Sequence, residues 1–401
     1  MVFTYGKAFR SLGHETYTVV WSKEIFNPTS QYDEVLRERH RSHRPTASPP
    51  KNVSESIFDT ARAGVKELSV FLKVLGKCDT FIFIFGTSFL PRFWDYPILK
   101  MCGKRIISVF LGSDIRYWYA YEQEMRLLGW EQELRPYIEY RKSDPADFFA
   151  RKLRVVQAAE RYADLILSNP EMGQLQTRPY MCAVFPLDLS QYRFNVPGRE
   201  VPVIVHAPTD ADAKGTRYVL STLEQLRKEG IRFKFRLIQR MPHNQFREVL
   251  ANADIVIDHL FGHALGALAA ESLATGNVVL GRYNPSYAHI PPDCPVVNVN
   301  KDTLAFELRR VILDRNLRQR LAHAGREYVQ KHHDHVTVVQ QIVNWLKPGG
   351  IDTYDVIPRF FKNSFVMPAK LLKEEKSRCR RRRGTGLRGW IKACFERLFQ
   401  L

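Results

Sequence analysis

The sequence predicts an α/β protein built from two doubly wound domains. Short apolar runs rich in β-branched residues alternate with amphipathic stretches, a pattern typical of parallel sheets covered by helices. With 401 residues and 45% hydrophobic content, the chain is long and apolar enough for two buried cores. We place the first domain at residues 1–190, the second at 191–346 and a basic tail at 347–401.

The helices and strands of the first domain are predicted from its apolar runs and from the glycine, proline and polar residues that end them. A helix is expected up to Gly13, then a strand at 18–21. Polar residues rich in Pro, Ser and Arg predict a surface loop at 27–55. Further along, the apolar pattern predicts a helix at 56–76, strands at 78–86 and 104–111 with a short helix at 94–103 between them, two or three helices within 120–163, and strands at 164–168 and 182–186.

The second domain follows an interdomain linker at residues 187–200. Its first predicted strand is VPVIVH, at 201–206, and the later apolar runs FKFRLIQ and ADIVIDHL alternate with helical stretches. The helix at 338–346 is expected to pack back on the first domain. Since both halves are doubly wound by pattern, they should face each other across a cleft.

Composition and charge exclude several protein classes. No apolar run approaches the roughly 20 residues that span a bilayer, and the N-terminus lacks the apolar segment of a secretory signal. Six scattered cysteines form no CxxC pair or metal-ligand cluster and suit a reducing cytosol. The net charge of +18 implies an anionic partner: a membrane surface, a nucleotide-sugar or a nucleic acid.

Three features lie where strands of the second domain should end: the turn at Lys214, the turn from Gly262 to Gly266, and Glu271 followed by Gly276. Lys214, Gly215 and Thr216 form a turn in which a lysine could hold a diphosphate while glycine lets the backbone approach; the alternative is a solvated lysine before a helix. Gly266 and Ala267 are expected to open a helix whose free amides bind phosphate, although an ordinary strand-to-helix turn has the same pattern. Ligands of open α/β sheets bind at this edge.

Glu271 lies in the otherwise apolar stretch AALAAESLATG, so its carboxylate needs a partner. Two ribose hydroxyls could serve, and the alternative is a salt bridge to Arg282. Asp210 and Asp212 have the letters of a DxD metal motif but belong to the lysine turn. We therefore assign no metal and no cofactor beyond a donor substrate.

These motifs resemble the nucleotide-sugar half of retaining GT-B glycosyltransferases of the family 4-like group. The resemblance rests on HAPTDADAKGT, on Gly266 and on Glu271 as the second of two glutamates eight positions apart. His263 occupies the position of the first glutamate, which in that family contacts the donor sugar. The resemblance implies two Rossmann-like domains and transfer of a sugar from a nucleotide-diphosphate donor with retention. In that family the first domain opens with a strand and a glycine-rich turn, which are absent or much shortened in this sequence.

In the first domain, Gly112-Ser113-Asp114 resembles the HGSD turn that lines the reaction centre of the family, with Leu111 in place of the histidine. Asp114, Arg116 and His263 are therefore the candidate catalytic residues. The alternative for the first two is a helix-capping aspartate and a surface arginine. Four aromatic side chains could stack on sugar rings or belong to the core: Trp118, Tyr119, Tyr121 and Trp130.

The tail is a separate electrostatic unit. Residues 370–401 contain 11 Lys/Arg and 3 Glu, a net +8, and from Leu387 to Phe399 apolar residues recur with helical spacing. A basic amphipathic helix of this kind fits an anionic membrane surface; docking on protein and binding of RNA are the alternatives, and nucleic acid is disfavoured.

The sequence thus predicts a cytoplasmic glycosyltransferase, peripheral on the inner face of the membrane, with a lipid-linked or surface-polysaccharide acceptor. Leu111, His263 and the missing opening strand leave open a catalytically degenerate binding or scaffold protein. A nucleotide-sugar epimerase of the same fold is the weaker alternative.

Overall fold

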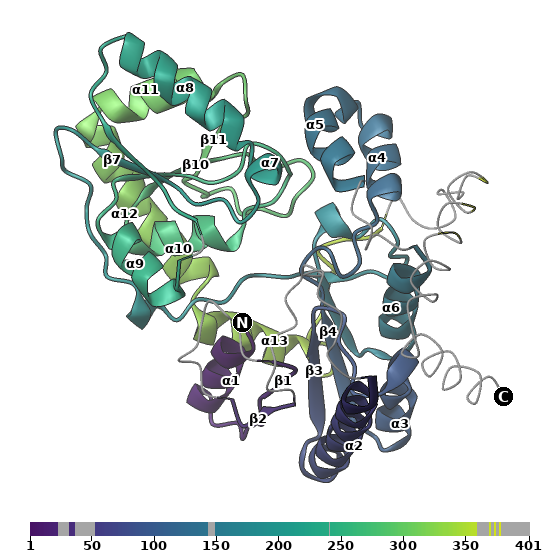
Figure 1. Ribbon diagram of the computed structural model, residues 1–401. Coiled ribbons are helices and arrows are strands. Elements are labelled where there is room, and N and C mark those ends of the chain that lie inside the picture. The colour runs from purple at the N-terminus through teal and green to yellow at the C-terminus, as the bar shows by residue number, and fades with distance from the viewer. Residues whose placement is uncertain are drawn as a thin grey trace.

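The computed structural model describes residues 1–22, 32–36, 53–142, 149–239 and 241–358, together with residues 369, 373 and 377. The amphipathic helix predicted at 387–401 lies outside the described residues. Two parallel sheets, each with helices on both faces, confirm the predicted fold class of two Rossmann-like domains (Figure 1).

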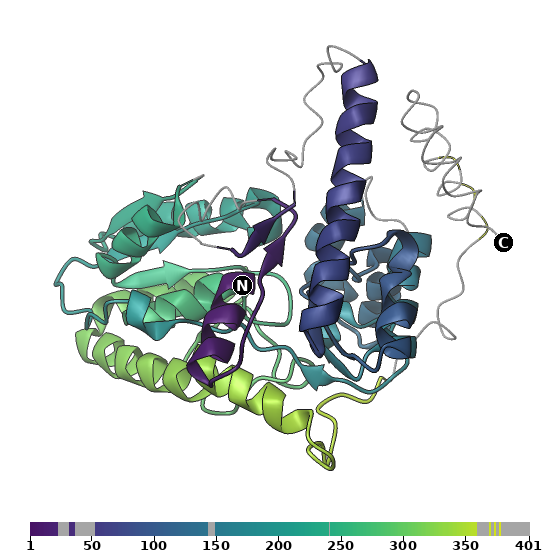
Figure 2. The same ribbon diagram turned by 90° about the horizontal axis from the view of Figure 1, so that it is seen from below.

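The first domain is built on a four-stranded parallel sheet in the order β3-β4-β5-β6. Apolar side chains point to both faces of its central strands, so each face needs a cover. Helices α2, α3 and α6 cover one face, and α2 extends well beyond the sheet (Figure 2). The elements are β3 (Thr80–Ile84), β4 (Arg105–Val109), β5 (Leu165–Ser168), β6 (Met181–Cys182), α2 (Val53–Lys77), α3 (Asp95–Met101) and α6 (Phe149–Tyr162), with short 3-10 turns η1 (Pro91–Phe93), η2 (Pro170–Met172) and η3 (Leu189–Gln191).

The other face of this sheet is covered by the two ends of the fold. Helix α1 (Val2–Ser11) packs against α13 (His335–Trp345), and both share a buried apolar cluster with β4 and β5. Val339 and Ile342 of α13 are buried against Ile107 and Leu165. The expectation that this late helix packs back on the first domain is confirmed. Without α1 and α13, this face of the sheet would expose its apolar side chains to water.

The prediction of a surface loop at residues 27–55 is wrong in part. Strand β1 (Val19–Val20) pairs in parallel with β2 (Glu34–Val35), and α2 already begins at Val53. Asp33 anchors the pair, since its Oδ2 accepts hydrogen bonds from the Thr18 amide at 2.7 Å and from the Thr18 hydroxyl at 2.6 Å. A two-residue strand among polar residues has no apolar period to reveal it.

The second domain has a five-stranded parallel sheet in the order β11-β10-β9-β7-β8. Helices α8 and α11 cover one face, and α9, α10 and α12 cover the other. The strand order reverses between β7 and β9, and ligands of doubly wound sheets bind at such a switch point. The elements are β7 (Val203–His206), β8 (Lys234–Leu237), β9 (Ile255–Ile257), β10 (Val278–Gly281), β11 (Val297–Asn298), α8 (Thr216–Lys228), α9 (His243–Ala251), α10 (Ala267–Thr275), α11 (Leu304–Leu313) and α12 (Arg315–His332).

The two domains touch through a helical hairpin of the first domain. Helices α4 (Trp118–Leu127) and α5 (Glu131–Lys142) stand over the carboxyl edge of their sheet, and α5 packs against α7 (Ala211–Lys214) of the second domain (Figure 1). A shared apolar cluster joins Trp118, Tyr121 and Met125 to Phe261. The hairpin therefore borders the switch point of the second sheet.

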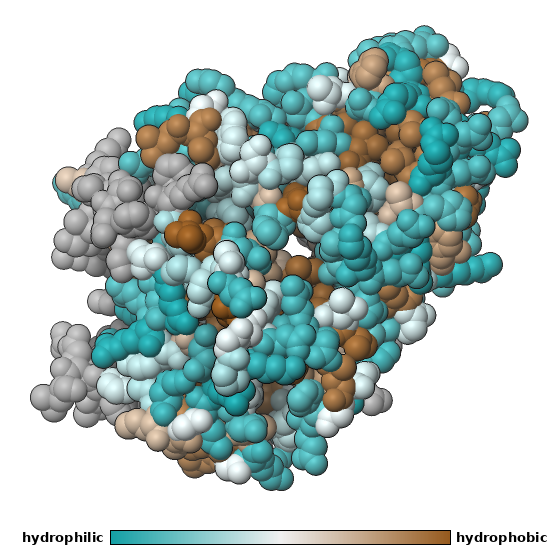
Figure 3. Space-filling view, turned by 180° about the vertical axis from the view of Figure 1, so that it is seen from behind, coloured by the Kyte–Doolittle hydropathy of each residue, from teal (hydrophilic) through white to brown (hydrophobic). Residues whose placement is uncertain are grey.

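The face of the molecule shown in Figure 3 is mostly hydrophilic, with apolar residues in small groups. Within the described part of the chain, no helix combines the length and the apolar character needed to cross a membrane.

Candidate functional site

Lys214 lies at the end of α7, directly after the central strand β7. Asp210 caps this short helix by accepting a hydrogen bond from the Ala213 amide at 2.9 Å. Gly215 follows with φ 75°, and a β-carbon there would lie 3.2 Å from that of Leu260, so the turn requires glycine. The Lys214 ammonium contacts Asp258 Oδ1 at 2.5 Å. Lys214 is therefore a paired cation rather than a solvated lysine.

Asp258 and His259, which sequence reasoning missed, follow β9 and complete this charge cluster. The Asp258 carboxylate is buried and contacts Lys214 on one oxygen and His259 Nδ1, at 3.2 Å, on the other. Burial raises the pKa of Asp258, but the charges of Lys214 and His259 outweigh this effect and hold it well below its ordinary value. The signal in the sequence was a polar pair directly after a buried apolar run.

Gly266 caps the N-terminus of α10, and Ala267 is the first helical residue. The Lys214 Nζ lies 3.9 Å from the position that a β-carbon would take on Gly266. The structure thus brings the lysine turn and the helix start together at the ends of the adjacent strands β7 and β9. An ammonium beside free helix amides is suited to binding phosphate.

Thr216 is buried, and its hydroxyl has a partner in the core of the second domain. It lies 2.9 Å from His206 Nε2, while His206 Nδ1 lies 2.8 Å from the Ile257 carbonyl oxygen. Burial lowers the pKa of His206, so the ring is neutral at physiological pH. In this structure Thr216 therefore orients a core histidine with its side chain.

Glu271 has partners within its own domain. Its Oε1 lies 3.0 Å from His243 Nε2, and the Tyr192 hydroxyl also hydrogen-bonds to the carboxylate. The alternative of a salt bridge to Arg282 is wrong, because Arg282 pairs with Glu133 of α5 at 3.0 Å. The carboxylate is thus held by two side chains, and its contact with a ribose stays a prediction.

The first-domain turn after β4 satisfies its own polar groups. Asp114 accepts hydrogen bonds from the Gly112 amide at 2.8 Å and the Leu111 amide at 3.2 Å. Burial raises the pKa of Asp114, although these amide bonds counteract it. The buried Lys152 donates to the Ser113 carbonyl at 2.9 Å. In this structure Asp114 closes the turn that precedes it, and it is not the helix-capping aspartate of the alternative, because the next helix, α4, begins at Trp118 after Tyr117.

Arg116 is buried and not at the surface. Its Nε donates to the Glu171 carbonyl at 2.8 Å, and its guanidinium lies 5.0 Å from the centre of the Trp118 ring. Nearby carboxylate and phenol groups outweigh the lowering by burial and raise its pKa further. Arg116 is therefore a fixed positive charge at the contact between the domains.

His263 is fully buried under the α4–α5 hairpin. Its ring centre lies 5.0 Å from that of Trp130 and 4.7 Å from that of Tyr287, and its Nε2 is 3.0 Å from Met125 Sδ. Burial lowers the pKa of His263 to about 4, so the ring is neutral. Within the described chain its Nδ1 has no hydrogen-bond partner. In this conformation no ligand can reach His263 unless the hairpin moves.

The aromatic residues considered for sugar stacking belong mainly to the same contact. Trp118 and Tyr121 are buried in the cluster that joins the domains, and Trp130 packs on His263 and Tyr287. They form core structure here rather than an open stacking surface.

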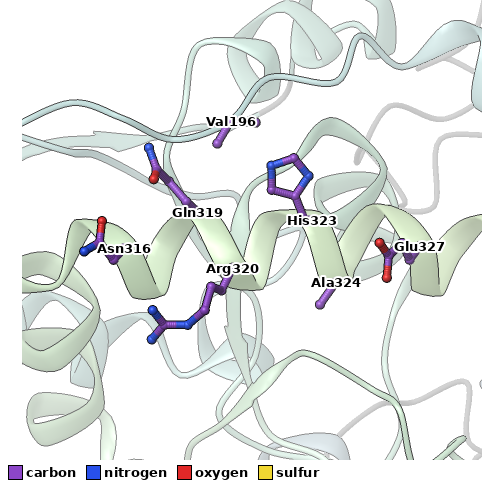
Figure 4. Close-up of a pocket in the computed structure, with 7 residues that line it drawn as sticks. All are labelled: Val196, Asn316, Gln319, Arg320, His323, Ala324 and Glu327. Carbon is purple, nitrogen blue, oxygen red and sulfur yellow. The ribbon is translucent and has the colours of Figure 1, made fainter.

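A separate open groove of about 660 Å³ runs along α12 (Figure 4). Figure 4 shows α12 side chains on one side and Val196 of the linker on the other. None of the predicted site residues lines it; the lining residues are Val196, Asn316, Gln319, Arg320, His323, Ala324 and Glu327. Among the described residues, no three His, Cys, Asp or Glu side chains come together as metal ligands.

Comparisons with known proteins agree with this architecture at the level of the fold. No protein-family model and no curated protein sequence matches the chain. Solved structures do match. A sucrose-phosphate synthase from Thermosynechococcus elongatus has a TM-score of 0.53 at 12% identity, over 84% of this chain and 90% of that chain.

Two further structures are similar over nearly their full length. WaaG, a glycosyltransferase involved in lipopolysaccharide biosynthesis, has a TM-score of 0.51 at 13% identity, over 86% of this chain and 95% of that chain. An alpha-glucosyltransferase in complex with UDP and DNA has a TM-score of 0.53 at 12% identity, over 86% and 94%. With its two Rossmann-like domains, the chain has the GT-B fold of these glycosyltransferases.

Proposed function

We propose that the chain is a glycosyltransferase that moves a sugar from a nucleotide-diphosphate donor, with retention, to a lipid-linked or surface-polysaccharide acceptor. The observation that carries the proposal is the Lys214 ammonium beside the start of α10, at the switch point of the second sheet. The shared fold of solved glycosyltransferases supports it.

In this proposal the second domain binds the donor. Lys214 and the amides at Gly266 and Ala267 neutralise the diphosphate as negative charge develops on the leaving group, which is a large electrostatic contribution in such reactions. Glu271 holds the ribose by exchanging its bond to His243 for hydroxyl groups. Gly215, which has no side chain, lets the backbone of the lysine turn come close to the diphosphate.

The first domain and the hairpin complete the reaction site. Asp114, Arg116 and His263 lie toward the sugar and acceptor, and His263 becomes accessible only when α4 and α5 move away. Transfer with retention, assisted by the leaving group on the same face of the sugar, needs no protein nucleophile. The proposal assigns none.

Nucleotide binding is the decisive test. Thermal-shift screening with UDP-, GDP- and ADP-sugars should reveal a donor, because a ligand that binds the native state raises the melting temperature. Lys214→Ala and Glu271→Ala should each weaken binding by about 1–3 kcal/mol, the scale of a lost charge-assisted hydrogen bond. Unchanged affinity of both variants in titration calorimetry would refute the donor site.

A scaffold protein without activity is the second candidate. Leu111 replaces a histidine, His263 is buried, and Asp258 already neutralises Lys214. Nucleotide binding without hydrolysis or transfer, in the presence of the natural acceptor, would favour this candidate over the enzyme.

The acceptor and membrane parts of the proposal rest on the sequence of the tail. The 11 basic residues of 370–401 each contribute about 1 kcal/mol near an anionic surface. Vesicle co-sedimentation should show salt-sensitive binding by the full chain and weaker binding by a chain that ends at Pro368. Equal binding by the two chains would refute it, and tail-dependent RNA binding alone would favour a nucleic-acid partner.

A further inference from the structure

Glu171 belongs to the first domain but places its carboxylate in the second. The residue lies in η2, directly after β5. Its Oε2 accepts a hydrogen bond from the Ala264 amide at 3.2 Å, and the backbone of His263 donates another. Both amides belong to residues 262–266, here called the donor turn, which leads into the start of α10. The side chain is nearly buried, with 10% of it exposed.

The donor turn has the shape needed to receive this carboxylate. Gly262 has φ 98°, and a β-carbon on it would lie only 2.8 Å from Glu171 Oε1. Glycine therefore allows both the left-handed backbone and the close approach of the oxygen. Arg116 also contacts Glu171: its Nη2 lies 3.8 Å from Oε1, and its Nε donates to the main-chain carbonyl.

The charges around Glu171 favour its ionised form. Burial raises its pKa, but the charge of Arg116 and the hydrogen bond from the His263 backbone outweigh burial and lower it. His263 is itself neutral and brings no negative charge to the turn. Glu171 is thus a carboxylate at the donor turn that is supplied by the other domain.

We propose that Glu171 is a positioning residue that orders the donor turn from across the domain contact and supplies the negative charge that this turn lacks at His263. Order in the turn is thereby coupled to the contact between the domains. The consequence for nucleotide-sugar binding rests on the proposed function, whereas the contact itself is testable without any ligand.

Hydrogen exchange of the full-length chain measures the contact directly. In Glu171→Gln, peptides covering the donor turn should exchange at least about tenfold faster, since about 1.4 kcal/mol of lost protection corresponds to a factor of ten. Glu160→Gln is the matched control, because Glu160 also caps backbone amides, those of Thr177 and Arg178, but within one domain. Exchange of the donor turn at the wild-type rate in Glu171→Gln would overturn the proposal.

A second measurement moves the negative charge from Glu171 to position 263, so the test does not depend on one variant. His263→Glu should lower the melting temperature, because it places two carboxylates in one buried site. In the Glu171→Gln background, His263→Glu should lower the melting temperature less, since the buried site then holds a single carboxylate beside Arg116. Strictly additive melting-temperature shifts would contradict a shared charge site.

Ligand binding then separates this inference from the proposed function. If the wild-type chain binds UDP-, GDP- or ADP-glucose, Glu171→Gln should weaken that binding about tenfold, and Glu133→Gln, a carboxylate that pairs across the same contact, should not. Equal affinity of Glu171→Gln and the wild-type chain would refute the coupling. Failure of the wild-type chain to bind any donor would count against the proposed function only, and exchange and melting would still decide the role of Glu171.

Discussion

The carboxyl edges of the two sheets use their polar residues differently. After β4 of the first domain, Asp114 and Lys152 bind main-chain amides and carbonyls of a single turn. After β7 and β9 of the second domain, Lys214, Asp258 and His259 bind one another through their side chains. In the first turn the charged side chains bind the backbone, whereas the second edge holds paired side-chain charges that can be shared with a ligand.

This difference indicates where a ligand can be accommodated with little reorganisation. A carboxylate that caps two amides of its own turn can leave only if the turn changes shape. A lysine paired with a carboxylate can instead rotate toward a phosphate while its partner keeps a second contact, as Asp258 keeps His259. The second domain is therefore the better place to look for the donor.

The largest expected effect comes from breaking the charge pair of the second domain. Lys214→Met should destabilise the fold by up to about 3–5 kcal/mol, because it leaves the buried Asp258 carboxylate without its lysine partner and with the His259 contact alone. Adding Asp258→Asn should recover part of the loss. Urea unfolding followed by circular dichroism measures both, and a loss below about 1 kcal/mol in the single variant would mean that the pair is solvated.

The second prediction concerns pH at the contact between the domains. Glu124 of α4 accepts hydrogen bonds from Tyr287 at 2.8 Å and Gln174 at 2.9 Å, and burial raises its pKa from 4.5 to about 7. Since the folded state binds this proton more tightly than the unfolded state, stability should fall as pH rises from about 4.5 to 7. The contribution is up to about 3 kcal/mol, at 1.36 kcal/mol per pH unit.

Glu124→Gln isolates this contribution. The variant removes the titrating group, so its stability should change less with pH over this window than that of the wild-type chain. Denaturant unfolding at several pH values provides the measurement. Parallel curves for the two proteins would show that Glu124 does not titrate at the contact.

The third prediction tests the self-capped turn of the first domain. Asp114→Asn should cost about 1–2 kcal/mol of stability, because a neutral amide accepts the Gly112 and Leu111 bonds less strongly. Nucleotide binding should be unchanged, and turnover should fall if Asp114 takes part in transfer. An altered nucleotide affinity in calorimetry would remove the contrast between the two edges.

The smallest effect is expected at Thr216. Thr216→Val removes the hydroxyl partner of His206 while keeping the side-chain volume, and should cost about 1 kcal/mol. Nucleotide affinity should not change, since the hydroxyl is turned into the core. Weaker nucleotide binding by this variant would return Thr216 to the donor site.

Much of the fold was accessible from the sequence because each domain repeats one pattern. The run Ile255–Ile257 and its neighbours are buried on both faces, so they stand out as apolar and β-branched, and the turn at Lys214 is marked by Gly215. The strand β2 was missed, because two polar-flanked residues held by Asp33 have no period of their own.

The candidate site was only partly predictable. Lys214, Gly266 and Glu271 are placed by local motifs, and the structure puts the first two side by side. Their partners Asp258 and His243 come from other elements, and Glu171 reaches the donor turn from the other domain. The partners of Arg282 and Glu271 could not be assigned from spacing along the chain.

By itself, the sequence determined the alternation of strands and helices, the glycines of turns such as those at Gly215 and Gly262, and the positive charge of the tail. These depend on neighbours within a few residues, and local sterics and hydrophobic period decide them. Only the tertiary structure decided that His263 is buried beneath α4 and α5, that Asp258 neutralises Lys214 and that Glu171 caps a turn of the other domain. Such contacts join residues far apart in the chain, and a buried charge takes whichever partner the fold brings within hydrogen-bond reach.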